Sequence, residues 1–125
     1  MKRAPALILT MIACCTAPQP QAPAPPRQAV ELAGRTAGPA QNCIPFDRTE
    51  GLRVSDSDPH TLLYGRGRTI WASRLDPGCG FSVNDVLVSE PISRYCRGDL
   101  VRSFDHLSRI PGPTCVLGSF APYSR

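Results

Sequence analysis

The sequence predicts a small all-β domain, either a single barrel or a strongly bent antiparallel sheet, stabilised by disulfides. From residue 43 onward, short runs of β-branched, aromatic and aliphatic residues alternate with Gly, Pro, Asp and Ser, which is typical of short strands and tight turns. None of these runs has the length and spacing of a long helix. Four cysteines are spread over the same region. A domain of about 80 residues is near the lower limit for independent folding, and cross-links make it credible.

The expected strands follow one another in short steps. Residues 52–54 and 61–64 flank a run with strong turn chemistry at 56–59. Residues 61–64 and 69–75 are expected to form a hairpin whose tip is Gly65-Arg66-Gly67. Three more apolar runs are expected to be strands: 86–88, 100–101 and 116–117. Helix is expected only in short pieces, such as those at 30–33, 83–86 and 104–107.

Residues 1–13 have the three-part plan of an export signal. Lys2-Arg3 is followed by an apolar stretch of about eight residues, far shorter than the roughly 20 needed to span a bilayer. Ala13 precedes Cys14 as in a bacterial lipobox, although Met11 stands where Leu is usual. We therefore expect lipidation at Cys14 and anchoring in the cell envelope, in the outer membrane facing the periplasm. The alternative is ordinary cleavage, which would give a soluble periplasmic or secreted protein.

Residues 14–42 are expected to form the anchor cysteine and a disordered tether. Six prolines lie between residues 16 and 42, and the segment from Ala17 to Arg27 is built almost entirely from Ala, Pro and Gln. Such a composition buries no core and favours an extended chain. The folded domain is therefore expected to span residues 43–125.

Cys43, Cys79, Cys96 and Cys115 predict two disulfides. Four cysteines in a small exported domain usually pair with one another. Structural zinc sites generally use close cysteine pairs, and the gaps here are 36, 17 and 19 residues. Three connectivities are open. We favour Cys79 with Cys96 and Cys43 with Cys115, because the second bond would tie the two ends of the domain together.

The region from Cys43 onward resembles a family of small exported bacterial domains of unknown function. The residues that carry the resemblance are Cys43-Ile44-Pro45, a hairpin ending at Leu75 followed by Cys79, and Cys96-Arg97-Gly98-Asp99. Cys115-Val116-Leu117-Gly118 completes the set. The resemblance implies an exported, cysteine-linked β domain and brings no activity, substrate or catalytic residue.

Three residues are candidates for binding a partner. Arg97 and Asp99 flank Gly98 in a tripeptide that integrins bind, but we expect a turn in which Gly98 takes a positive φ and Asp99 accepts backbone hydrogen bonds. Trp71 is expected in the core or on a half-buried sheet surface. If Trp71 and Tyr64 both face solvent beside the arginines of the hairpin, the hairpin is expected to bind an anionic polymer or glycan.

The remaining titratable residues predict no catalytic or metal site. Asp56 and Asp58 fit a turn better than a calcium loop. His60 and His106 have no partner at a ligand spacing, and Asp85 and Glu90 would act as an acid and base only if folding brought them together. We expect no cofactor.

The charge of residues 43–125 argues against nucleic-acid binding. They contain ten arginines and nine acidic side chains, a net charge of +1. The expected function is a non-enzymatic binding or structural role in the periplasm or at the outer membrane, with an envelope protein or polymer as partner. The alternative is a small periplasmic hydrolase or an enzyme inhibitor.

Overall fold

The structure is a computed structural model that describes residues 28–91 and 93–125. The predictions for residues 1–27, including the signal peptide and lipidation at Cys14, lie outside the described residues. The described chain contains one 3₁₀ helix and ten strands. They are η1 (Val30–Leu32), β1 (Thr36–Ala37), β2 (Cys43–Pro45), β3 (Arg53–Val54), β4 (Thr61–Tyr64), β5 (Thr69–Arg74), β6 (Asp85–Val88), β7 (Arg94–Cys96), β8 (Leu100–Asp105), β9 (Pro111–Val116) and β10 (Phe120–Ser124).

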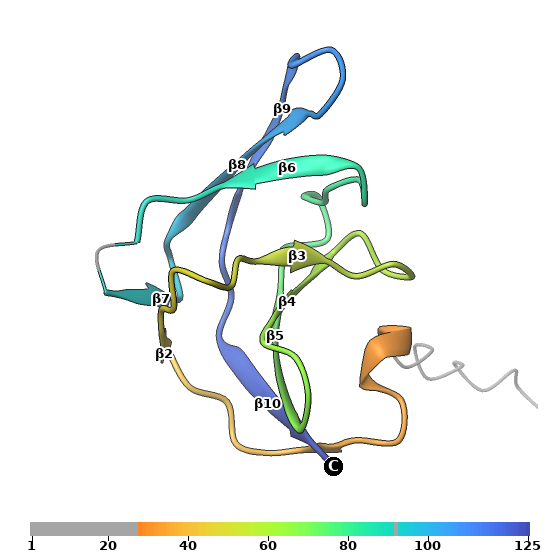
Figure 1. Cartoon of the computed structure of the whole chain (residues 1–125), viewed down its shortest axis with the longest axis vertical. Coiled ribbons are helices and arrows are strands. Elements are labelled where there is room, and N and C mark those ends of the chain that lie inside the picture. Colours follow the sequence, from red (N-terminus) through yellow and green to blue (C-terminus); the bar gives the residue numbers. More distant parts are fainter. Residues whose placement is uncertain (1–27, 92) are drawn as a thin grey trace, which may run out of the picture.

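The strands form three antiparallel sheets (Figure 1). One sheet has five strands in the order β1-β10-β5-β4-β3, a second pairs β2 with β7, and the third has the order β6-β8-β9. The described strands do not close into one hydrogen-bonded ring, so of the two predicted architectures the bent sheet is the one observed. The predicted all-β fold class is confirmed.

The predicted hairpin forms between β4 and β5, with Tyr64 opposite Trp71. Its tip requires glycine, because Gly65 and Gly67 adopt φ values of 85° and 84°. The three later runs form β6, β8 and the end of β9. A single turn of 3₁₀ helix occurs where a short helix was expected near residue 30, but residues 83–86 and 104–107 form no helix and instead overlap β6 and the end of β8.

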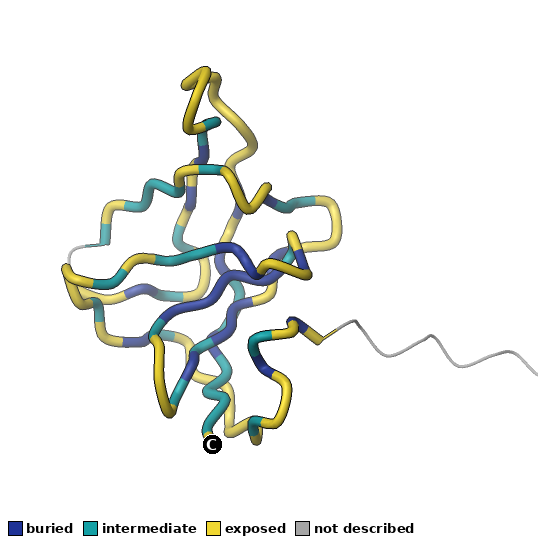
Figure 2. The backbone as a smooth tube through the Cα atoms, turned by 45° about the vertical axis from the view of Figure 1, so that its right-hand side comes forward, coloured by how far each residue is buried: buried dark blue, intermediate teal, exposed yellow. Residues whose placement is uncertain are grey.

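The main core lies between the sheets. Strand residues that alternate along the chain point into it, and Figure 2 shows the buried segments where the strands cross. Its fully buried members include Ile44 from β2, Leu62 from β4, Val101 from β8 and Phe120 from β10. Each sheet therefore contributes to one continuous core, which is why so small a chain forms a single unit.

A second, smaller cluster covers the opposite face of the five-stranded sheet. Ala29 and Leu32 pack against Leu63, Ile70 and Ala72 of β4 and β5. β4 is consequently buried on both faces, since all four of its residues are buried.

Hydrogen bonds hold the segment before Cys43 in place. A carboxylate oxygen of Glu31 accepts from the Ser55 hydroxyl at 2.7 Å and the other accepts from the Asp56 backbone N–H at 2.7 Å. β1 then pairs with β10. The prediction that the tether continues to residue 42 is therefore wrong for residues 28–42, because apolar residues in this segment cover a sheet face that would otherwise be open to water.

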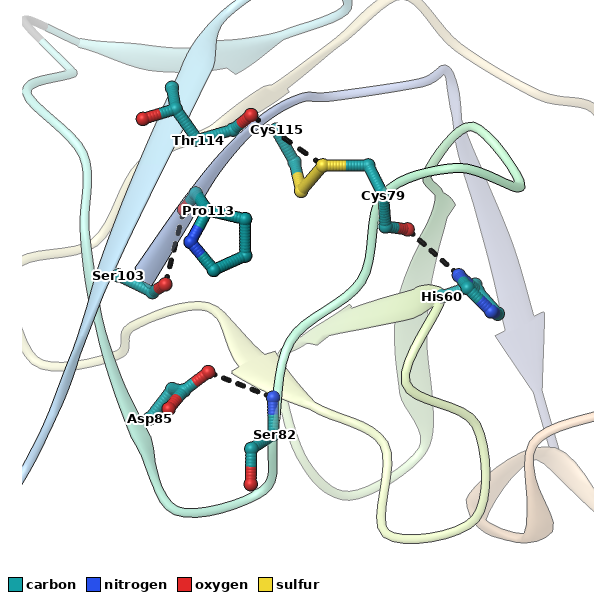
Figure 3. The surroundings of a disulfide bond; sticks show 8 residues. All are labelled: His60, Cys79, Ser82, Asp85, Ser103, Pro113, Thr114 and Cys115. Atoms are coloured by element: carbon teal, nitrogen blue, oxygen red, sulfur yellow. Dashed lines mark hydrogen bonds between the residues drawn. A yellow bond between two sulfur atoms is a disulfide. The ribbon is translucent and has the colours of Figure 1, made fainter. Parts of the chain in front are cut away.

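The two predicted disulfides form, but the favoured pairing is wrong. The bonds join Cys43 to Cys96 and Cys79 to Cys115. Strand pairing explains the first, since β2 and β7 place Cys43 directly opposite Cys96. The second joins the loop after β5 to β9, and Cys79 lies beside the Thr114 carbonyl (Figure 3). The bond therefore links the five-stranded and three-stranded sheets.

Candidate functional site

A groove, which we call the arginine groove, lies on the face of the five-stranded sheet that the N-terminal segment partly covers. Small side chains form its floor: Thr61, Ala72 and Ala121. Ala29 and Leu32 line one side, and Arg74 and Arg97 lie in the lining with Asp76. The groove has a volume of about 660 Å³, which is in the range of small-molecule sites. It exists because the N-terminal segment covers only part of the sheet.

Two guanidinium groups are available to a ligand in this groove. The side chain of Arg74 is 52% exposed. Its Nη2 lies 3.9 Å from Asp58 Oδ2, too far for a hydrogen bond. Arg97 is exposed and belongs to neither of the two ion pairs found among the described residues. An anion with an apolar portion would meet both cationic donors and apolar surface here.

Asp58 is a structural residue rather than a free acid. Its Oδ1 accepts from the His60 backbone N–H at 2.9 Å, and its Oδ2 accepts from the Thr61 hydroxyl at 2.7 Å. Burial works to raise the pKa of Asp58, but the Thr61 and His60 hydrogen bonds and the charge of Arg74 outweigh it, so the pKa is lowered. Asp58 thus fixes the turn before β4, as expected for a turn residue.

The predicted turn at Arg97-Gly98-Asp99 is present and it positions Arg97. Gly98 has a φ of 93°, and Asp99 Oδ2 accepts from the Cys96 backbone N–H at 2.8 Å. The Arg97 N–H donates to the Asn42 carbonyl at 2.6 Å, and the Gly98 N–H donates to the Leu117 carbonyl at 2.9 Å. These bonds hold the turn between the N-terminal segment and the approach to β10. Arg97 therefore reaches the groove, while the carboxylate of Asp99 is bound within the turn.

The third predicted binding residue, Trp71, lies in a different place. It is half-buried and lines a shallow cleft with Tyr64 and Phe46. The structure therefore separates Arg97 from Trp71 and does not combine the three candidates in one site.

The possible acid–base residues have separate structural contacts. Asp85 Oδ2 accepts from the Ser82 backbone N–H at 2.8 Å, and His60 Nδ1 lies 2.7 Å from the Cys79 carbonyl oxygen (Figure 3). Glu90 and Asp99 line one hollow of about 630 Å³, where the Glu90 side chain is 83% exposed and lies 3.4 Å from Arg102. The Asp99 carboxylate serves the turn, so this hollow lacks a paired acid and base aimed at one point.

Two further features are absent from residues 28–91 and 93–125. No group of three His, Cys, Asp or Glu side chains there is placed to hold a metal ion. No helix in that part of the chain has the length and apolar character needed to cross a membrane.

The two disulfides are typical of proteins that fold in an oxidising, exported environment. No family model, curated protein or solved structure matches this chain.

Sequence reasoning missed the arginine groove because it assigned the groove's side wall to the tether. A signal was present in β4. The unbroken run Thr61–Tyr64 has apolar residues on both faces, which calls for cover on both sides. Ala29 and Leu32 are three positions apart, which is the spacing at which one helical turn places two side chains on the same face. Taken together, these two patterns predict that residues 29–32 pack on the outer face of the sheet that contains β4.

Proposed function

We propose that this protein is an exported envelope protein that binds an anionic, partly apolar ligand in the arginine groove without chemically altering it. The observation that carries the proposal is the pair of exposed arginines, Arg74 and Arg97, beside an apolar floor. Charged donors next to apolar surface favour a ligand with a carboxylate and an aliphatic part. A short peptide that ends in a free carboxylate has this chemistry.

The location of the protein is part of the same proposal. The export signal, Cys14 and the resemblance to exported bacterial domains support a lipid anchor in the outer membrane, with the domain in the periplasm. The disulfides support an exported compartment. A lipid anchor would keep the groove near envelope components and raise their effective concentration.

A peptide titration tests the binding role. The probe is a randomised tetrapeptide library with free C-terminal carboxylates, compared with the same library amidated, and binding is followed by NMR shifts of the full unlipidated chain. The expected result is a saturable shift around Arg74, Arg97 and Ala72 with the carboxylate library only. Arg74→Ala should weaken binding about tenfold, the usual contribution of a hydrogen bond to a charged group.

Arg102→Ala is the matched control, because Arg102 has a similarly exposed side chain, 61%, on the three-stranded sheet. It should leave binding unchanged. Equal binding of carboxylate and amidated peptides, or equal losses in both arginine variants, would contradict the anionic ligand.

Intact mass of the protein from its native envelope tests the anchor. A lipid-bearing mass that begins at Cys14, lost in Cys14→Ser together with membrane fractionation, is the expected result. An unlipidated mature chain would contradict the anchor and leave the groove proposal standing.

A further inference from the structure

A second concave surface, which we call the aromatic cleft, lies on the far side of the β4–β5 hairpin strands from η1. Pro45, Phe46, Tyr64 and Trp71 line it, with Asp47 and Arg48 completing the lining. Its volume is about 640 Å³. Tyr64 and Trp71 are cross-strand partners in β4 and β5, whereas Pro45 and Phe46 come from the end of β2. The cleft therefore brings together two sheets.

The rings of the cleft are held by contacts behind them. The Tyr64 hydroxyl accepts from the Asp47 backbone N–H at 2.8 Å. Phe46 and Tyr64 both pack edge-to-face on Tyr95, with ring centroids 5.2 and 5.5 Å apart from it. The Phe46 N–H donates to the Ser93 carbonyl at 3.2 Å, next to the strands that the Cys43–Cys96 disulfide joins. A ligand would meet a surface that is already ordered, which reduces the entropy cost of binding.

Trp71 adds a hydrogen-bond donor to this apolar surface. Its indole N–H donates to no described residue. Among the fully buried side-chain nitrogen and oxygen atoms of the described residues, only Arg35 Nε lacks a partner, so the Trp71 N–H is at least partly open to solvent. Aromatic faces beside a free indole donor match the requirements of a polyproline II ligand, whose proline rings pack on aromatic surfaces and whose carbonyls have no internal partners.

We propose that the aromatic cleft binds a proline-rich segment in the polyproline II conformation, with a ligand carbonyl accepting from the indole N–H of Trp71. The chain itself contains a sequence of this chemistry. Residues 17–27 contain two overlapping P-x-x-P patterns, 20–23 and 23–26, and end in Arg27. Asp47 offers a negative partner to such an arginine, because the backbone N–H and hydroxyl of Thr49 lower the pKa of Asp47 and keep it ionised. The occupant we assign is therefore this proline-rich sequence from a second copy of the chain, because Gln28, the residue after Arg27, lines the arginine groove on the opposite face of the sheet, away from Asp47.

A C-terminally amidated peptide that copies residues 16–28 tests the assignment without offering the arginine groove a carboxylate, and Trp71 reports on binding as the single tryptophan of the chain. The protein is the full unlipidated Cys14→Ser chain, with Pro20, Pro23, Pro25 and Pro26 replaced by Ala so that its own segment does not compete. Addition of the peptide should shift the Trp71 emission to shorter wavelength in a saturable way. The same peptide with its prolines replaced by alanine should have no effect.

Two variants separate ligand contact from folding. Trp71→Phe keeps an aromatic ring, although a smaller one, and removes the N–H, so it should weaken binding of a fluorescein-labelled peptide at least about fivefold, the effect expected for one hydrogen bond. Arg102→Ala lies on the three-stranded sheet, outside both the arginine groove and the aromatic cleft, and should leave peptide affinity unchanged. Both variants should still unfold cooperatively by circular dichroism, with Trp71→Phe at a somewhat lower midpoint because Trp71 packs against the main core.

Three outcomes would overturn the proposal. The proline-rich peptide fails to change Trp71 emission, or the alanine peptide binds as tightly, or Trp71→Phe binds with parental affinity. Binding of a chitotetraose probe in place of the peptide would assign the cleft to a sugar and also overturn it. Because the groove is tested with carboxylate peptides and Arg74, failure here leaves the proposed function unaffected.

Discussion

The two larger sheets bury their outer faces to different extents. The five-stranded sheet has Ala29 and Leu32 packed on its outer face, and both residues are almost fully buried. The three-stranded sheet leaves Leu100 60% exposed and Val116 45% exposed, and these two residues are cross-strand partners. Figure 2 shows the hairpin between β8 and β9 largely exposed, whereas all four residues of β4 are buried. Residues before Cys43 therefore belong to the domain, because within the described part of the chain they cover the outer face of one sheet and leave that of the other open.

The largest loss of stability is expected from removing the disulfide that joins the five-stranded and three-stranded sheets. Replacing Cys79 and Cys115 together with Ala removes the bond between them. In the chain-entropy model, a cross-link that closes a loop of this size contributes about 4 kcal/mol to the free energy of unfolding. Urea unfolding should show a loss of that order. A loss below about 1 kcal/mol would mean that the sheets are held together without the cross-link.

The next largest loss of stability is expected from truncating a residue that covers the outer face of the five-stranded sheet. Leu32→Ala should lower the free energy of unfolding by about 2–4 kcal/mol, because Leu32 is buried between η1 and the sheet. Leu100→Ala is the matched control on the other sheet and should change it by less than about 0.5 kcal/mol, as an exposed substitution does. Equal effects of the two substitutions, measured by urea unfolding, would contradict the difference between the faces.

The smallest effect concerns Glu31, which attaches the covering segment to Ser55 and Asp56. Burial works to raise the pKa of Glu31, but hydrogen bonds from the Asp56 N–H and the Ser55 hydroxyl outweigh it, so the pKa is lowered from its ordinary 4.5. A depressed folded-state pKa means that the stabilisation is complete above that ordinary value and is lost as pH falls through the folded pKa.

Glu31→Gln should therefore lower the free energy of unfolding by about 1 kcal/mol at pH 7. The difference between the variant and the parent chain should shrink as the pH falls below 4.5. Thermal unfolding at several pH values measures this. A difference that stays constant over the acid range would show that the charge of Glu31 plays no part.

The sequence was sufficient to predict six of the ten described strands and the pairing of β4 with β5, but not β1, β2, β7 and β10 or the other strand partners. Gly65 and Gly67 mark the tip of the β4–β5 hairpin, because a tight turn needs residues that accept a positive φ. The disulfide pairing depended on which strands meet across the core, and β2 pairs with β7 over a separation of 53 residues between Cys43 and Cys96. No local pattern records such a contact, and three connectivities were consistent with the spacing.

The candidate sites were predicted only in part. The turn around Gly98 was readable from its residue types, and Arg97 was named as a candidate, but its place in the groove depends on contacts with Asn42 and Leu117. Trp71 was named together with Tyr64, but Phe46 was missed because it reaches the cleft from the end of β2, which belongs to a different sheet. Composition assigned residues 28–42 to the tether. Average composition does not reveal that single residues such as Leu32 fit an uncovered sheet face.

The central claim is that residues 28–37 are an integral part of the folded domain, and amide hydrogen exchange of the full chain tests it most directly. The Leu32 and Arg35 amides donate to the Ala29 and Leu32 carbonyls at 3.0 and 3.2 Å, and β1 pairs with β10. These amides should be protected from exchange by at least about a hundredfold, since opening the segment would expose Leu32. Exchange of both amides at the rate of an unstructured peptide, with β4 and β5 still protected, would contradict the account and return these residues to the tether.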